Sequence, residues 1–115
     1  MLGFPQIKRY FMHTNSTDMR KSFTGLSGLV LNEMKKELRN GDGFVFFNKR
    51  RTLVKIMVWD RTGFAIYYKK LSKGSFELPL WEEDSKSLEL SLTNLLLILE
   101  GIQLESVKFR KRYNG

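Results

Sequence analysis

The chain has no cysteine and only one histidine among its 115 residues. Without cysteine it forms no disulfide and offers neither a thiolate metal ligand nor a cysteine nucleophile. His13 has no second imidazole with which to hold zinc, so we expect no zinc site. The longest apolar run, Leu95 to Leu99, falls far short of the ~20 residues that span a bilayer. Because Met1 to Tyr10 also lacks the apolar core of a secretory signal, we expect a cytoplasmic protein.

Residue patterns that would support catalysis are also scarce. Metal-dependent cleavage of nucleic acid requires two or three carboxylates that converge on magnesium. Asp60 opens an Asp-Arg-Thr-Gly turn, where an aspartate usually caps its own backbone, and Asp42 lies between two glycines. The chain has no G-x-S-x-G sequence and no G-K-[ST] phosphate loop. We therefore expect a protein that is not an enzyme and needs no cofactor, with a metal-dependent nuclease as the less favoured alternative.

Positive and negative charges are segregated along the chain, whose net charge is +8. Residues 1–40 carry +4 and residues 41–75 carry +6, whereas residues 76–105 carry −6 and residues 106–115 carry +4. Such segregation predicts a basic surface suited to a polyanion and an acidic surface suited to a basic partner. The alternative is that the two regions neutralise each other within the fold.

A long helix is expected near the N-terminus, after a short strand at Ile7 to Met12. From Asp18 to about Arg39, apolar residues recur at steps of three and four, which is typical of one buried helical face. These residues are Met19, Phe23, Leu26, Val30, Met34 and Leu38. Asn40 to Gly43 then provides the residues that end a helix and form a turn.

An antiparallel meander follows, because two short polar links separate three runs rich in β-branched and aromatic residues. The runs are Phe44 to Phe47, Thr52 to Trp59 and Phe64 to Leu71. In the second run we expect Thr52, Val54, Ile56 and Val58 to face the long helix. Ser91 and Gly101 fit the start and stop of a closing helix, Leu92 to Glu100. The predicted fold is thus a single α+β domain, residues 1–105, with the long N-terminal helix packed on the meander, and a basic tail, residues 106–115.

The first predicted helical turn contains two cations where helix physics favours anions. Arg20 and Lys21 follow Asp18, and together with the free N–H groups of the helix start they predict a seat for phosphate. The alternative is that both are solvated and that one of them pairs with Asp18.

The predicted sheet offers a second set of cations. Lys49, Arg50 and Arg51 occupy a hairpin tip, and Lys55, Trp59, Tyr67 and Lys69 are expected together on one exposed sheet face. Cations interleaved with flat rings are typical of nucleic-acid surfaces, where the cations contact phosphates and the rings stack on bases. The alternative is that Trp59 and Tyr67 pack under the C-terminal segment.

Three blocks of sequence resemble the TnpB accessory proteins of IS66-type insertion sequences, which are unrelated to the RNA-guided nucleases of the same name. The blocks are TDMRKSFTGL at Thr17–Leu26, FVFFNKRRTLVKIMVWDRTGFAIYYKKLSKGSFELP at Phe44–Pro79 and LLLILEGI at Leu95–Ile102. The resemblance covers roughly Ile7 to Gln103, and the basic tail beyond it has no counterpart in the family pattern. It implies a small protein that is encoded beside a separate transposase and is needed for full transposition.

From the residues and the resemblance together, we expect a non-catalytic accessory factor that binds DNA phosphates without much sequence preference and helps to assemble the complex of transposase and DNA. The alternative is a protein adaptor that makes no DNA contact. In that case the acidic segment Glu77 to Glu89 or the closing helix would dock on the transposase.

Overall fold

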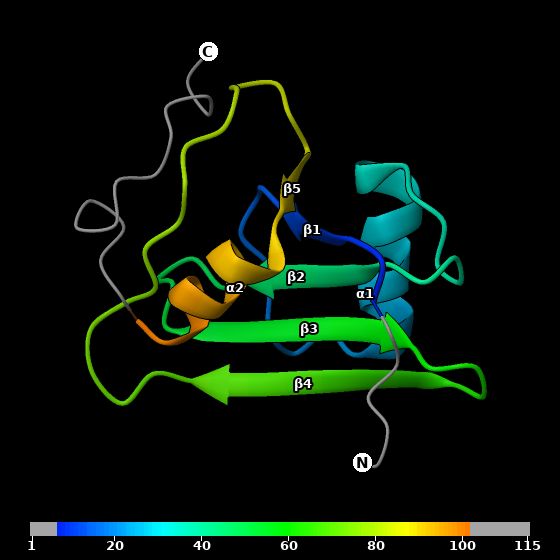
Figure 1. Cartoon of the computed structure of the whole chain (residues 1–115), viewed down its shortest axis with the longest axis horizontal. Coiled ribbons are helices and arrows are strands. Elements are labelled where there is room, and N and C mark those ends of the chain that lie inside the picture. The colour runs from blue at the N-terminus through cyan, green and yellow to red at the C-terminus, as the bar shows by residue number, and fades with distance from the viewer. Residues whose placement is uncertain (1–6, 102–115) are drawn as a thin grey trace.

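The computed structural model describes residues 7–101, which form one five-stranded sheet covered by helices on both faces (Figure 1). The elements in chain order are β1 (Tyr10–His13), α1 (Phe23–Leu29), the π-helical segment η1 (Val30–Met34), β2 (Gly43–Phe47), β3 (Leu53–Trp59), β4 (Phe64–Lys70), β5 (Ser87–Leu90) and α2 (Leu92–Leu99). The strands lie in the order β4-β3-β2-β1-β5. β1 runs parallel to β2, and the other neighbouring strands are antiparallel.

Each face of the sheet has its own apolar cluster. On the face covered by α1 and η1, Leu26, Val30 and Met34 pack on strand residues such as Phe44 and Met57. The cluster on the α2 face consists of Met12, Val45, Phe47, Val54, Ile56, Phe76, Leu90, Leu95 and Ile98. Because β2 is buried on both faces, all five of its residues are apolar or glycine.

The prediction of a long helix from Asp18 to Arg39 is wrong, and so is the architecture built on it, although the chain does combine helices with a sheet. The helix begins only at Phe23, because the carbonyl groups of Met19 and Lys21 accept hydrogen bonds from the ammonium group of Lys55. It widens into η1 after Leu29 and ends at Lys35, whose backbone is left-handed with φ 58°. Tertiary contacts therefore override the helical periodicity at the start of the helix, and a left-handed residue ends it before the predicted Arg39.

The meander of β2, β3 and β4 is confirmed, but the expected placement of its faces is wrong. Val54 and Ile56 belong to the cluster under α2, and Met57 faces α1. The sheet also contains two strands beside the meander, because β1 pairs in parallel with β2 and β5 closes the edge next to β1. β5 has only four residues, Ser-Leu-Glu-Leu, which is too short a pattern to identify a strand without its partner.

The closing helix begins at Leu92 as predicted and ends at Leu99, one residue before the predicted Glu100. The Ser91 hydroxyl oxygen accepts a hydrogen bond from the backbone N–H of Asn94 at 3.1 Å, and Gly101 has φ 78°. Leu95 and Ile98 face the sheet, whereas Leu92 and Leu96 are half-exposed on the outer side of α2. Within residues 7–101 none of the helices has the length and apolar character that a membrane span requires. The basic tail at 106–115 lies outside the described residues.

Candidate nucleic-acid interface

The turn between β2 and β3 carries three consecutive cations and is braced by hydrogen bonds of Asn48. The side-chain oxygen of Asn48 accepts hydrogen bonds from the backbone N–H groups of Thr52 and Leu53, both at 2.9 Å. The N–H of Arg51 donates to the Asn48 carbonyl at 3.0 Å, and the Arg51 backbone is left-handed with φ 59°. Lys49, Arg50 and Arg51 are all exposed, and we call these three residues the hairpin tip. Across residues 7–101 none of the three forms an ion pair with a carboxylate.

A pocket of about 210 Å³ opens beside the hairpin tip. Its lining comes from residues 13–16 after β1, from residues 47–49 and Arg51 of the hairpin, and from Leu78 and Trp81 in the loop that precedes β5. The guanidinium carbon of Arg51 lies 5.9 Å from the centre of the Trp81 ring. We call this cavity the tip pocket. It combines apolar and aromatic walls with hydroxyl, amide and cationic groups, so it can take a flat polar ring.

Residues 13–16 form a fixed wall of the tip pocket. His13 is buried, with Nδ1 at 3.0 Å from the Asn15 carbonyl oxygen and Nε2 at 2.8 Å from a Glu33 carboxylate oxygen. The Thr14 hydroxyl donates to the Ser85 carbonyl at 2.6 Å. The N–H of the buried Thr17 donates to the Phe47 carbonyl at 2.8 Å. These bonds attach the segment to η1, to the end of β2 and to the loop that precedes β5.

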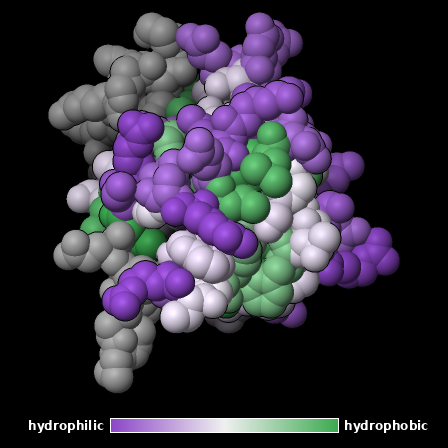
Figure 2. Space-filling view, turned by 90° about the vertical axis from the view of Figure 1, so that its right-hand side faces the viewer, coloured by the Kyte–Doolittle hydropathy of each residue, from purple (hydrophilic) through white to green (hydrophobic). Residues whose placement is uncertain are grey.

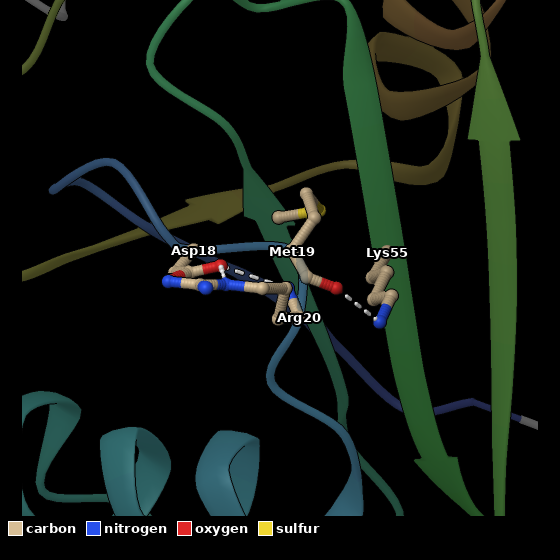
Figure 3. A network of polar contacts seen from close by, with 4 residues as sticks. All are labelled: Asp18, Met19, Arg20 and Lys55. Atoms are coloured by element: carbon tan, nitrogen blue, oxygen red, sulfur yellow. Dashed lines mark hydrogen bonds and ion pairs between the residues drawn. The ribbon is translucent and has the colours of Figure 1, made fainter.

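Arg20 and Lys21 precede the helix instead of opening it. The Arg20 guanidinium folds back on Asp18, with Nη2 at 2.6 Å from one carboxylate oxygen, as Figure 3 shows. Hydrogen bonds from the side chain and the backbone N–H of Arg20 hold the pKa of the Asp18 carboxyl well below its usual range. The predicted phosphate seat at a helix N-terminus is therefore absent here, because the N–H groups and these cations do not meet at a helix start. Lys21 is exposed and lies alongside Gly25.

Lys55 and Lys69 lie on opposite faces of the sheet, so the expectation of one shared face is wrong. Lys55 pairs in register with Tyr68, and Lys69 pairs with Val54. Lys55 is buried, and its ammonium group donates to the Met19 carbonyl at 2.7 Å (Figure 3). It also donates to the Lys21 carbonyl at 2.8 Å. The Lys69 ammonium donates to the carbonyl of Leu99 at the C-terminal end of α2, at 2.7 Å. Both lysines stabilise the fold through these backbone contacts.

Trp59 and Tyr67 are separated in the same way. The Trp59 ring contacts Phe64 edge-on at 5.0 Å between ring centres, and the Arg39 guanidinium lies 4.5 Å above it. Tyr67 pairs with Ile56 on the α2 face and is half-exposed. The alternative, in which these rings pack under the C-terminal segment, stays untested for residues 102–115, which lie outside the described part of the chain.

Other cations lie over aromatic rings on the α1 face. The Lys36 ammonium is 4.1 Å and the Arg9 guanidinium carbon 5.1 Å from the centre of the Phe11 ring. Figure 2 shows the side of the molecule on which α1 and the β3–β4 turn lie, where hydrophilic side chains surround a hydrophobic patch. Arg9 is also 3.9 Å from the carboxylate of Glu89. These cations are engaged by rings and by a carboxylate, whereas those of the hairpin tip have no acidic partner among residues 7–101.

Of the residues chosen from the sequence, the structure thus brings Lys49, Arg50 and Arg51 together on one turn and separates the others. The polar wall at Asn15 and Ser16 and the ring of Trp81 were missed. The residues that flank these positions in the sequence gave no indication of a binding site. The chain around Trp81 is acidic, and only the tertiary fold brings Trp81 next to the basic turn.

Comparison with known proteins identifies the family. The family model of IS66 Orf2-like proteins matches residues 8–109. The chain belongs to this family. It is thereby an accessory protein associated with transposition, as the resemblance predicted. It is 30% identical to the uncharacterized protein y4hO of Sinorhizobium fredii over 89% of this chain and 87% of the relative. It is 29% identical to y4jC of the same organism over 94% and 91%. No solved structure gives a significant match.

Proposed function

We propose that this protein is a non-catalytic accessory factor that binds DNA phosphates through the hairpin tip and helps to assemble the complex of transposase and DNA in the cytoplasm. The observation that carries the proposal is the braced turn with three consecutive exposed cations, none of them paired with a carboxylate among residues 7–101. Cations presented in this way are free to displace the counterions of DNA. The chain belongs to a transposition-associated family, and transposition acts on DNA, so DNA is the polyanion that we propose as the ligand.

The number of available cations sets the strength of binding. Lys55 and Lys69 are engaged by backbone carbonyls and Arg20 by Asp18, so the proposed contacts come from the hairpin tip and from the exposed Lys21. The backbone N–H of Thr17 donates a hydrogen bond to Phe47, the last residue of β2 before the hairpin tip. Lys21 follows four residues later and therefore lies at most about 14 Å along the chain from this contact. Three to four phosphate contacts predict a slope of log affinity against log salt of about −2.7 to −3.6. Affinity should then fall roughly 40- to 150-fold between about 50 and 200 mM salt.

A titration of labelled duplex DNA at several salt concentrations tests the proposal. The double variant Lys49→Gln plus Arg50→Gln should weaken binding and lower the magnitude of the salt slope by about two, because each lost contact removes about 0.9. The matched control is Lys35→Gln plus Arg61→Gln, which removes the same charge from two other exposed positions. Binding that is independent of salt, or equally weakened in both double variants, would contradict the proposal.

A protein adaptor is the second candidate, and one observation favours it. Leu92 and Leu96 lie one helical turn apart on the outer side of α2 and are 55% and 51% exposed, so α2 presents apolar surface away from its own core. A pull-down with the transposase distinguishes the two functions. The adaptor predicts that Leu92→Ser plus Leu96→Ser loses the transposase, whereas the hairpin variant retains it and DNA binding is absent throughout.

A further inference from the structure

We infer that the tip pocket holds a single unpaired nucleobase of the DNA strand whose phosphates lie on the hairpin tip. The inference rests on the proposed function and adds to it, since cations alone would bind any polyanion. A base held in this pocket would make the protein prefer single-stranded or unpaired DNA to intact duplex.

The walls of the tip pocket match the two kinds of surface that a nucleobase presents. Trp81, Leu78 and Phe47 provide apolar and aromatic surface, on which the flat face of a base can stack. The lining also includes the side chains of Asn15 and Ser16, which are exposed and make no hydrogen bond within the described residues. Their amide and hydroxyl groups are free to bond the polar edge of a base. A phosphate alone would leave the apolar wall without a role.

Arg51 connects the pocket to the proposed phosphate contacts. It lines the tip pocket, and its guanidinium carbon lies 5.9 Å from the centre of the Trp81 ring. This separation lies near the ~6 Å outer limit of a cation–π contact, so Arg51 and the indole are neighbours at this end of the pocket. Lys49 also lines the pocket. A nucleotide carries its base and its phosphate on the same sugar, so a base inside the pocket would bring the neighbouring phosphates to Lys49 and Arg51.

The size and rigidity of the tip pocket set what can enter. A volume of about 210 Å³ is smaller than the roughly 300–1,000 Å³ of pockets for drug-sized ligands, so it suits one base rather than a base pair. His13, Thr14 and Thr17 fix the wall through bonds to Glu33, Ser85 and Phe47. A wall that is already ordered costs little entropy when the ligand binds. Entry from a duplex would require unpairing of the base, which favours DNA that is already single-stranded.

Tryptophan fluorescence can observe the pocket directly. In the full chain carrying Trp59→Phe, Trp81 is the sole tryptophan. Titration with oligothymidine should quench its fluorescence, because the base stacks on the indole, whereas a blunt duplex of equal length should bind with little quenching. Trp81→Leu should weaken binding of oligothymidine by roughly five- to 150-fold and change duplex binding less than about twofold. Trp59→Leu is the matched control, because Trp59 lies at the far end of β3, and it should leave both affinities unchanged.

A second variant guards against loss of folding in Trp81→Leu. Ser16→Leu places an apolar side chain at an exposed position of the pocket rim and should abolish the preference for single strands while the thermal melt is unchanged. If both DNAs bind without quenching Trp81 fluorescence, and with the same affinities in Trp81→Leu and Ser16→Leu as in the parent, the pocket inference is overturned. The proposed function then stands. If neither DNA binds, both are overturned.

Discussion

Replacing Arg51 with glycine removes one cation from the hairpin tip at a position where glycine suits the backbone better than arginine. Arg51 has φ 59°, a left-handed conformation that costs a residue with a Cβ about 1–2 kcal/mol. Glycine avoids that cost, but it loses about 0.5–1 kcal/mol through its more flexible unfolded chain and about 0.5–1 kcal/mol through the missing contact with Trp81. These terms nearly cancel, so Arg51→Gly should keep its free energy of unfolding within ~1 kcal/mol of the parent.

DNA affinity should nevertheless fall. One phosphate contact contributes about 0.9 to the salt slope, which at about 0.1 M salt corresponds to a roughly eightfold loss of affinity. The matched control is Arg61→Gly. Arg61 also has a left-handed backbone, with φ 84°, but it lies in the turn at the other end of the seven-residue β3, about 20 Å away. This control removes the same charge and relieves the same backbone conformation, so it should bind DNA within about twofold of the parent.

Fluorescence anisotropy of a labelled duplex at several salt concentrations gives the affinity and the slope, and thermal melting gives the stability. If Arg51→Gly binds DNA as tightly as the parent, the hairpin tip does not contact DNA. If the two glycine variants lose affinity equally, binding follows net charge and not this surface. Only a loss confined to Arg51→Gly supports the reasoning.

Other expected outcomes follow from single contacts. Asp18→Asn should release Arg20 and make the salt slope steeper by about one, as DNA titration would measure, and an unchanged slope would exclude Arg20 from the interface. The pKa of Asp18 is lowered in the folded state, so its contribution to stability is present above the unfolded pKa and is lost as pH falls through the folded pKa. The melting temperatures of the parent and of Asp18→Asn should therefore converge as the solution is acidified. A difference that stays constant with pH would contradict this role of Asp18. Lys55→Met should cost about 1–3 kcal/mol in urea unfolding, because two carbonyls lose their donor, and a neutral result would contradict that role. Ser91→Ala should cost about 1 kcal/mol through the lost cap of α2, whereas Ser91→Asn should retain it.

The predictions that held were those carried by neighbours in the chain. The short links at 48–51 and 60–63 predicted the two hairpins, since the turn residues bond their own backbone, as Asn48 and Asp60 do. Ser91 and Gly101 predicted the ends of α2 for the same reason. The position of three cations on one turn followed from the hairpin alone. The family assignment likewise needed only the order of the sequence blocks.

The placement of faces could not be predicted in the same way. Side chains alternate along both β3 and β4, and a shift of one residue in their pairing moves every side chain of one strand to the other face. The register Lys55↔Tyr68 therefore separates Lys55 from Lys69, although the same alternation is compatible with a shared face. Likewise, apolar spacing is compatible with a helix from Met19 onward, but the buried Lys55 ammonium takes the carbonyl groups that such a helix needs.

Sequence alone determined the turns of the meander, the cap and stop of α2, the charge pattern and the family, because each depends on residues adjacent in the chain or on their order. The tertiary structure decided which cations remain available, since a lysine is available for DNA only where no carbonyl or carboxylate from a distant segment lies within reach. It also decided the tip pocket, whose walls come from three segments that meet only after the sheet has formed.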